Sequence, residues 1–189
     1  ASVNRAVASA AADYVLLLDS RITSLSEDLV EQLMGYVQRK DVAMAAARTS
    51  NLEDKIYHAF LVMGIDKSFG YAFHQLDKGN NGYFMRINAP QDVSGVDITC
   101  TLIRRADYMA AGQLDESMPV EYAAADLCLK VAQLNDEGSS AFRADEGEDA
   151  KTPQMWRDMH KIVYVPYAEA VINASAEPKW HIDEEDEKF

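Results

Sequence analysis

Residues 13–21, with the sequence DYVLLLDSR, constrain the fold more than any other stretch of this chain. Four consecutive apolar residues at 15–18 end abruptly at Asp19. An apolar run of this kind is typical of a strand that is buried on both faces in the middle of an α/β sheet. Ligands of open α/β sheets collect at the carboxyl ends of the strands, which makes Asp19 a candidate ligand for a metal or a diphosphate. The alternative is that Asp19 and Ser20 only make the turn after the strand.

The charge of the chain narrows the classes of partner. Its 189 residues include 31 acidic and 18 basic side chains, which gives a formal net charge of −13. This balance argues against nucleic acid or an anionic membrane as the main partner. Two dense acidic runs, at 136–149 and 183–186, are interpreted as solvated loop and tail. No apolar run approaches the roughly 18 residues that a membrane-spanning helix needs, and the two cysteines are predicted to be buried, reduced thiols.

Apolar periodicity predicts helices that alternate with short strands. Ser24 and Glu27 match a capping box, which predicts a helix from about residue 25 to residue 39. A loop rich in glycine and aromatic residues is expected at 65–93. The other predicted helices are at 2–12, 106–112, 122–135 and 153–160, and the other strands are at 42–47, 56–64, 96–105 and 161–172, the last interrupted at Pro166. This order predicts an α/β domain with a mixed sheet flanked by helices over residues 1–175, followed by an acidic tail at 176–189.

Familiar catalytic motifs are missing from the sequence. There is no phosphate-cradling glycine loop, no Gly-x-Ser-x-Gly, no His-Glu-x-x-His and no Cys-x-x-Cys. His58 lies within an apolar run and is interpreted as a core or rim histidine rather than a ligand. His74 lies among aromatic residues of the long loop. It is a candidate substrate contact, because sugar sites combine aromatic faces with polar groups.

Several segments, in order, resemble the second half of the glycosyltransferase family 2 domain, which has the GT-A fold. The similarity covers most of residues 4–175 and is nearest to the rhamnosyltransferase-like branch of the family. The segments that carry it are Asn4 ten residues before Tyr14, LLLDSR at 16–21, CTLIRR at 100–105, GQLDE at 112–116, DLCLK at 126–130 and VPYAEAVI at 165–172.

The resemblance implies transfer of a sugar from a nucleotide diphosphate donor to a glycan acceptor. The family usually binds Mn²⁺ or Mg²⁺ through an Asp-x-Asp at the end of this strand. Asp19 matches the first aspartate and is the implied metal ligand, whereas Arg21 stands at the second. A guanidinium cannot ligate a metal but can stabilise a diphosphate directly, and the alternative is decay of the site.

Other positions also depart from the family pattern. The acidic general base is expected two residues before Asp126, where this chain has Ala124. The small Gly-Ala turn falls on Ile98 and Thr99, and the histidine expected after the last strand falls on Ile172. Asp126 itself is retained, either as an acceptor-side residue or as a residue that only orients its helix. The family motifs are therefore degenerate here.

The amino-terminal βαβ portion of the family, which holds the base and ribose of the donor, would precede Asn4. We expect either a longer parent protein or another chain that completes the sheet by pairing with its exposed edge. Three hypotheses remain open: an active glycosyltransferase domain, a non-catalytic GT-A domain that acts as a binding or scaffolding module, and an acidic α/β domain with chance matches. If the site has decayed, restoring aspartate at positions 21 and 124 is expected to improve metal or nucleotide binding, or at least not to harm the fold. The resemblance suggests a location in the cytoplasm, either free or at the inner face of the membrane.

Overall fold

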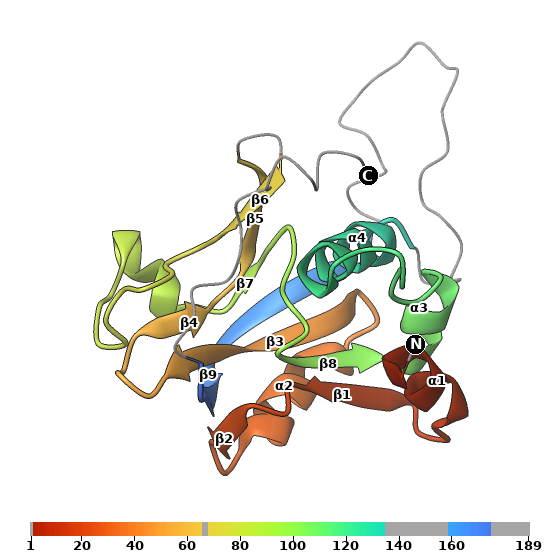
Figure 1. The fold of residues 1–189 in the computed structure, drawn as a ribbon, viewed down its shortest axis with the longest axis horizontal. Helices are drawn as coiled ribbons and strands as arrows, with labels where there is room; N and C mark the ends of the chain where they lie inside the picture. Colours follow the sequence, from red (N-terminus) through yellow and green to blue (C-terminus); the bar gives the residue numbers. More distant parts are fainter. Residues whose placement is uncertain (1, 66–67, 135–158, 175–189) are drawn as a thin grey trace.

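A mixed sheet forms the centre of the protein. The computed structural model describes residues 2–65, 68–134 and 159–174 (Figure 1). Seven strands form the sheet, whose main path runs β1-β8-β3-β9-β2, with β4 beside β3 and β7 beside β9; β5 and β6 form a separate pair. The strands are β1 (Tyr14–Leu18), β2 (Ile22–Leu25), β3 (Val42–Asn51), β4 (Ile56–His58), β5 (Leu61–Ile65), β6 (Ser68–Tyr71), β7 (Gln91–Asp92), β8 (Cys100–Arg104) and β9 (Lys161–Ile172). The helices are α1 (Ser2–Ser9), α2 (Leu29–Val37), the 3₁₀ segment η1 (Tyr83–Asn88), α3 (Arg105–Ala110) and α4 (Val120–Ala132). The predicted α/β class with a mixed sheet is confirmed.

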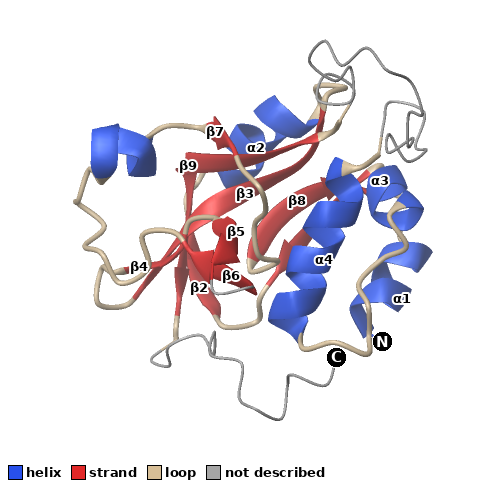
Figure 2. Cartoon of the chain, turned by 90° about the horizontal axis from the view of Figure 1, so that it is seen from above, coloured by secondary structure: helices blue, strands red, loops and turns tan. Residues whose placement is uncertain are grey.

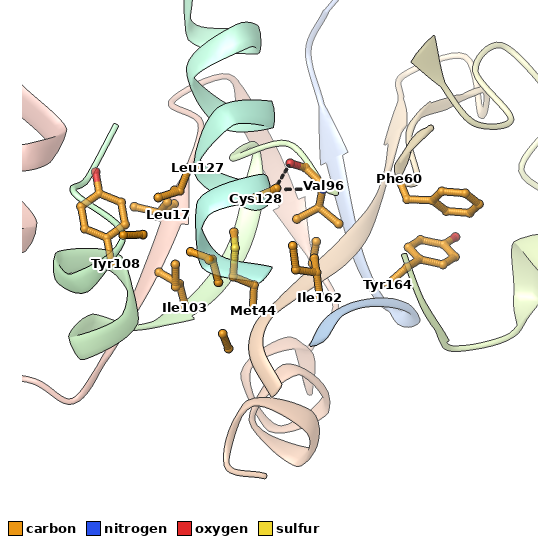
Figure 3. Close-up of a cluster of buried hydrophobic side chains, with 14 of the residues drawn as sticks. Leu17, Met44, Phe60, Val96, Ile103, Tyr108, Leu127, Cys128, Ile162 and Tyr164 are labelled. Carbon is orange, nitrogen blue, oxygen red and sulfur yellow. Dashed lines mark hydrogen bonds between the residues drawn. The ribbon is translucent and has the colours of Figure 1, made fainter. Parts of the chain in front are cut away.

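Helices cover the two faces of the sheet unequally. The core beneath α1, α3 and α4 includes Met44, Ile103 and Leu127 (Figures 2 and 3). The core beneath α2 includes Leu33 and Ala45. Neighbouring residues of β3, such as Met44 and Ala45, belong to different cores because successive side chains of a strand point to opposite faces. This explains why β3 reads as an unbroken apolar run and is buried throughout.

The strand that precedes Asp19 lies at an end of the sheet path. Among the described strands, β1 pairs only with β8, in antiparallel register. Leu18 is 46% exposed, and Tyr14, Val15 and Leu16 are half-buried. The predicted strand is confirmed, but its expected central position is wrong for the described part of the chain, because no described strand covers its outer edge.

Pro166 does not interrupt the last strand. β3 and β9 run parallel, and their register is irregular after the pair of Ala47 and Val165 and resumes at Arg48 and Glu169. Pro166 therefore lies in a bulge of β9, where a residue without a backbone N–H does not break the ladder.

The predicted capping box is also not formed. Ser24 lies in β2, opposite Val171, and α2 begins only at Leu29. The backbone groups at Ser24 form strand hydrogen bonds with β9 and are therefore not free to begin a helix. Long-range strand pairing thus overrides the local capping signal of Ser24 and Glu27.

Other boundaries differ from the predicted ones. The apolar run at 56–64 splits into β4 and β5, and the expected loop at 65–93 contains β6, η1 and β7. The acidic run at 136–149, most of the predicted helix at 153–160 and the tail at 176–189 lie outside the described residues. No described helix is long and apolar enough to cross a membrane.

Two polar residues of the segments that carry the family resemblance fasten α1 to the rest of the protein. Arg105 donates from Nε to the carbonyl of Val7 (3.0 Å) and from Nη2 to that of Ala8 (2.9 Å), at the end of α1. Asn4 of α1 donates to the carbonyl of Leu114 (2.8 Å) and accepts from its amide (3.2 Å). These polar side chains satisfy backbone groups at a helix end and in a turn, so their role is structural.

Both cysteines are buried and reduced, as predicted. Cys128 contacts the backbone of Val96, donating from Sγ to its carbonyl at 3.2 Å (Figure 3). Burial raises the pKa of the Cys100 and Cys128 thiols to about 12.

We expect neither thiol to react with a disulfide reagent in the folded chain at pH 8, because the reactive thiolate is suppressed and shielded. Both are expected to react at once in guanidinium chloride, which a spectrophotometric thiol assay measures. Rapid labelling of a native thiol would contradict this, and the single variants Cys100→Ser and Cys128→Ser would identify which one reacts.

Candidate functional site

Polar residues gather at the edge of the sheet where β1, β3 and β9 end. β3 pairs with β8 through residues 44–46 and, further along the strand, with β4 through Thr49 and Ser50. β4 and β8 therefore lie one after the other along the same edge of β3, with the end of β4 next to the start of β8. The residues before β8 therefore meet the end of β4, beside the turn after β1. Seven of the nine buried polar side chains of the described chain lie in or next to these segments: Arg48, Thr49, Ser50, Asn51, His58, Thr99 and Thr101.

Asp19 and Arg21 form a closed pair in the turn after β1. The Arg21 backbone amide and Nε donate to Asp19 Oδ1 at 2.8 and 3.0 Å, and Nη2 donates to Oδ2 at 2.7 Å. The hydrogen bond from Arg21 holds the pKa of Asp19 below its ordinary value, against the effect of partial burial. The Arg21 side chain is 51% exposed and that of Asp19 is 24% exposed. The Arg21 guanidinium is therefore exposed to solvent, and both carboxylate oxygens of Asp19 face that guanidinium.

This geometry does not fit a divalent metal at Asp19. Arg21 occupies both carboxylate oxygens and places a cation where the family has a second acidic ligand. No group of three or more His, Cys, Asp or Glu side chains within residues 2–65, 68–134 and 159–174 is arranged to hold an ion. Mn²⁺ and Mg²⁺ prefer several oxygen ligands, whereas both oxygens of Asp19 already accept hydrogen bonds from Arg21.

His58 and Asp97 form a second pair beside the first. His58 Nε2 lies 2.6 Å from Asp97 Oδ2, and the two side chains are 9% and 12% exposed. Thr99 donates to Asp97 from its amide (2.8 Å) and from Oγ1 (2.9 Å). Burial alone would raise the pKa of Asp97, but the His58 charge and these hydrogen bonds hold it below its ordinary value.

The other ring nitrogen of His58 is unsatisfied. Nδ1 is buried and has no hydrogen-bond partner among the described residues. The sequence pattern predicts a satisfied core or rim residue here. His58 is a rim residue, but it is only half satisfied. Its partner Asp97 lies 39 positions away in the sequence, so no local pattern signals the pair.

Aromatic rings surround this histidine. The ring centroids of Tyr57 and Tyr71 lie 4.3 and 4.4 Å from that of His58. The ring centroid of His74 lies 6.0 Å from that of Tyr57 and 6.2 Å from that of Tyr71, and its Nδ1 is 2.8 Å from the Tyr57 carbonyl. The structure therefore places His74 in the aromatic group around His58, whose partner Asp97 is bound by Thr99, and the Thr99 carbonyl accepts from the Asp19 amide at 2.8 Å.

Asp126 does not join these residues through any recorded contact. It lies on α4, where Lys130 one turn later binds its Oδ2 at 2.6 Å. No hydrogen bond or ion pair among the described residues connects it to Asp19, Arg21 or His74. This arrangement agrees with the alternative in which Asp126 orients its helix.

A second charged cluster lies at the same edge and was not expected from the sequence. Arg48 donates from Nη1 to Asn88 Oδ1 (2.9 Å) and from Nη2 to Glu169. Lys78 binds the other carboxylate oxygen of Glu169 at 2.6 Å. Burial favours a higher pKa for Glu169, but Lys78 and Arg48 hold the pKa below its ordinary value. The cluster ties the long loop to β3 and β9.

The positions that depart from the family pattern are packed. Ala124 is 1% exposed on α4, and Ile172 is fully buried in β9. Thr99, in place of a small residue of the family turn, holds Asp97. The substitutions therefore have packing and hydrogen-bonding roles in this chain.

Part of a much longer bacterial protein is similar in sequence to this chain. The chain is 32% identical over 130 residues to the uncharacterized protein y4gI of Sinorhizobium fredii (strain NBRC 101917 / NGR234). The match covers 68% of this chain and 14% of that protein, so the chain spans about a seventh of its relative. No family model matches the chain.

Proposed function

We propose that this chain is a glycosyltransferase family 2-like domain of the GT-A fold that binds a nucleotide diphosphate-sugar at the rim after β1. The observation that carries the proposal is the Arg21 guanidinium, half-exposed and oriented by Asp19 at the carboxyl end of a sheet strand. This end of α/β sheets is where nucleotide ligands collect, and a planar guanidinium matches the geometry of phosphate.

The spatial relations of the resembling segments support the proposal. LLLDSR and CTLIRR pair side by side as β1 and β8, and VPYAEAVI pairs with β3. Asn4 binds Leu114 of the GQLDE segment, and Cys128 of DLCLK contacts Val96, just before β8. Segments that are far apart in the sequence thus form one connected unit.

Arg21 takes the role that a metal has elsewhere in the family. In this proposal its Nε and Nη2 groups release Asp19 and bind oxygens of the donor diphosphate, offsetting the charge that grows on it as the sugar departs. Asp19 then keeps the hydrogen bond from the Arg21 backbone amide, which maintains the turn. The acceptor is a glycan hydroxyl. A cytoplasmic location, at the inner face of the membrane, belongs to the same proposal.

Titration calorimetry with UDP, GDP and dTDP, each with and without Mn²⁺, tests the proposal. We expect binding without metal. Arg21→Ala is expected to weaken it about 10- to 100-fold, since a charge-assisted hydrogen bond contributes about 1.5–3 kcal/mol. Asp19→Asn is expected to strengthen it up to about fivefold, because an exposed ion pair that competes for Arg21 contributes about 0.2–1 kcal/mol.

The same variants distinguish this proposal from a metal site. If Asp19 ligated Mn²⁺, Asp19→Asn would remove a metal-dependent affinity instead of strengthening a metal-independent one. Arg39→Ala is the matched control, because Arg39 forms a similar exposed pair with Asp41 (2.9 Å) outside the rim. Equal affinity in the Arg21→Ala variant would contradict the assignment.

A non-catalytic binding or scaffolding module is the second candidate. The buried Ala124 favours it, because the position that carries the acidic base in the family has no carboxylate and no space for one. Nucleotide binding without sugar transfer to any acceptor would favour this module over the enzyme.

A further inference from the structure

The alanine at position 124 leaves the proposed transfer without the proton acceptor that the family uses. We propose that His58, positioned by Asp97, takes this role and accepts the proton of the attacking acceptor hydroxyl. This role rests on the proposed function and adds the catalytic base to it.

Asp97 imposes one tautomer on His58. The ionised carboxylate can only accept a hydrogen bond, so His58 donates from Nε2 across their 2.6 Å contact. The lone pair of the neutral ring then lies on Nδ1. An aspartate that orients one ring nitrogen while the other takes a proton is the arrangement of hydrolase triads. Thr99, with two hydrogen bonds to Asp97, fixes the carboxylate in turn.

The Nδ1 atom of His58 has vacant hydrogen-bonding capacity. His58 is 7% exposed, and Nδ1 has no partner among the described residues. A buried polar atom without a partner is rare and costs free energy. An acceptor hydroxyl would supply the missing donor. Of the two rings packed on His58, Tyr57 is buried and Tyr71 is half-buried.

His58 also lies close to the proposed donor site. The Asp19 amide donates to the Thr99 carbonyl at 2.8 Å, and the Thr99 hydroxyl binds Asp97, the partner of His58. Tyr71 connects His58 to the start of α4, because the ring of Phe69 lies 6.0 Å from that of Tyr71 and 5.3 Å from that of Tyr122. His58 therefore lies between the subsite at Arg21 and the helix that carries the base in the family.

The tyrosine, cysteine and aspartate side chains around His58 are unsuited to the task. Burial raises the pKa of Tyr57 and of Tyr71 and raises that of Cys100 to about 12. The pKa of Asp19 is held below its ordinary value by the hydrogen bond from Arg21, which makes this carboxylate a poor proton acceptor. Asp97 is occupied by His58 and Thr99. Imidazole is the side chain that exchanges protons readily near neutral pH.

The acceptor oxygen forms a bond to the anomeric carbon of the donor sugar, while the bond from that carbon to the diphosphate oxygen breaks. The bonding pair leaves with the diphosphate, which Arg21 holds. The hydroxyl proton moves to His58 Nδ1, and Asp97 stabilises the resulting imidazolium until the proton passes to water.

The variants His58→Gln and Asp97→Asn separate nucleotide binding from turnover. Nucleotide affinity is measured by calorimetry. Turnover is measured as nucleotide diphosphate released from UDP-, GDP- and dTDP-sugars, with water or methyl glycosides as acceptors. We expect affinities within about twofold of the wild type, because neither residue holds the diphosphate. We expect turnover to fall at least about 100-fold in His58→Gln, the range of general base catalysis, and at least about tenfold in Asp97→Asn.

The pH profile distinguishes a catalytic histidine from a structural one. Wild-type turnover is expected to rise as the pH increases through the titration of an imidazole, and this limb is expected to vanish in His58→Gln. His160→Gln is the matched control, because it removes a buried histidine at the start of β9, at the opposite end of the sheet. Circular dichroism verifies that each variant is folded.

Binding and turnover fail in distinguishable ways. If no nucleotide binds to the wild type, the proposed function fails. If nucleotide binds and the wild type shows no turnover, or if folded His58→Gln turns over as the wild type does, the assignment of His58 is overturned while donor binding stands.

Discussion

Replacing Arg104 with alanine is expected to lower the free energy of unfolding by about 3 to 5 kcal/mol, the usual effect of removing one partner of a buried ion pair. Arg104 Nη1 binds Asp107 at 2.6 Å, and the Asp107 side chain is 7% exposed. Nη2 donates to the carbonyls of Val37, Arg39 and Val42 at 3.1, 2.9 and 3.0 Å. The variant would leave a buried carboxylate without this cation and three carbonyls at and after the end of α2 without their donor.

Urea unfolding followed by circular dichroism measures this effect. Arg105→Ala is the matched control, because the neighbouring arginine donates to two carbonyls at the end of α1 and to no buried carboxylate among the described residues. Its expected cost is about 1–3 kcal/mol, because each of the two hydrogen bonds contributes about 0.5–1.5 kcal/mol. Arg104→Lys is expected to fall between the two, since it keeps the charge but loses the planar fork. Equal losses in the two alanine variants would contradict the assigned role of Arg104.

Restoring the family carboxylate with Ala124→Asp is expected to destabilise the protein by several kcal/mol rather than to improve binding. Ala124 is 1% exposed, and Ala123 and Ala125 beside it on α4 are also buried. An aspartate there would lose its hydration without a cation nearby in the described packing, which carries a cost of several kcal/mol per ion. From the sequence alone, this substitution is expected to leave the fold unharmed. The sequence does not reveal how tightly α4 is packed around Ala124.

The matched control for this variant is Leu129→Asp on the same helix. Leu129 is 48% exposed, so the same carboxylate would remain hydrated and change the stability by about 0.5 kcal/mol or less. Thermal unfolding of both variants at pH 7 makes the comparison. A stable Ala124→Asp protein with improved nucleotide binding would show that the helix has space for a base and would revive the family mechanism.

The two proposals for this site depend on different residues and fail separately. Donor binding depends on Arg21, and proton transfer depends on His58. A chain that binds nucleotide through Arg21 but needs no His58 would be a binding module. A chain that needs both would be an enzyme whose base has moved from α4 to β4.

Local patterns in the sequence determined much of the secondary structure. The apolar run at 15–18 predicted β1 and the polar turn at Asp19, and the apolar stripe of α2 predicted a helix there. These predictions hold because hydrophobic periodicity reports which face of a segment is buried, whichever partner buries it. The burial of the two reduced cysteines was also predicted, because free cysteine packs as a small hydrophobic side chain.

The tertiary structure alone decided which strands pair and which polar residues meet. β1 lies at the end of the described sheet path rather than in its middle. Ser24 belongs to β2 because its backbone pairs with β9. The pair of His58 and Asp97 joins residues 39 positions apart, and the ion pair of Arg48 and Glu169 joins residues 121 positions apart. Periodicity carries no information about such partners, because long-range contacts depend on how the completed elements pack.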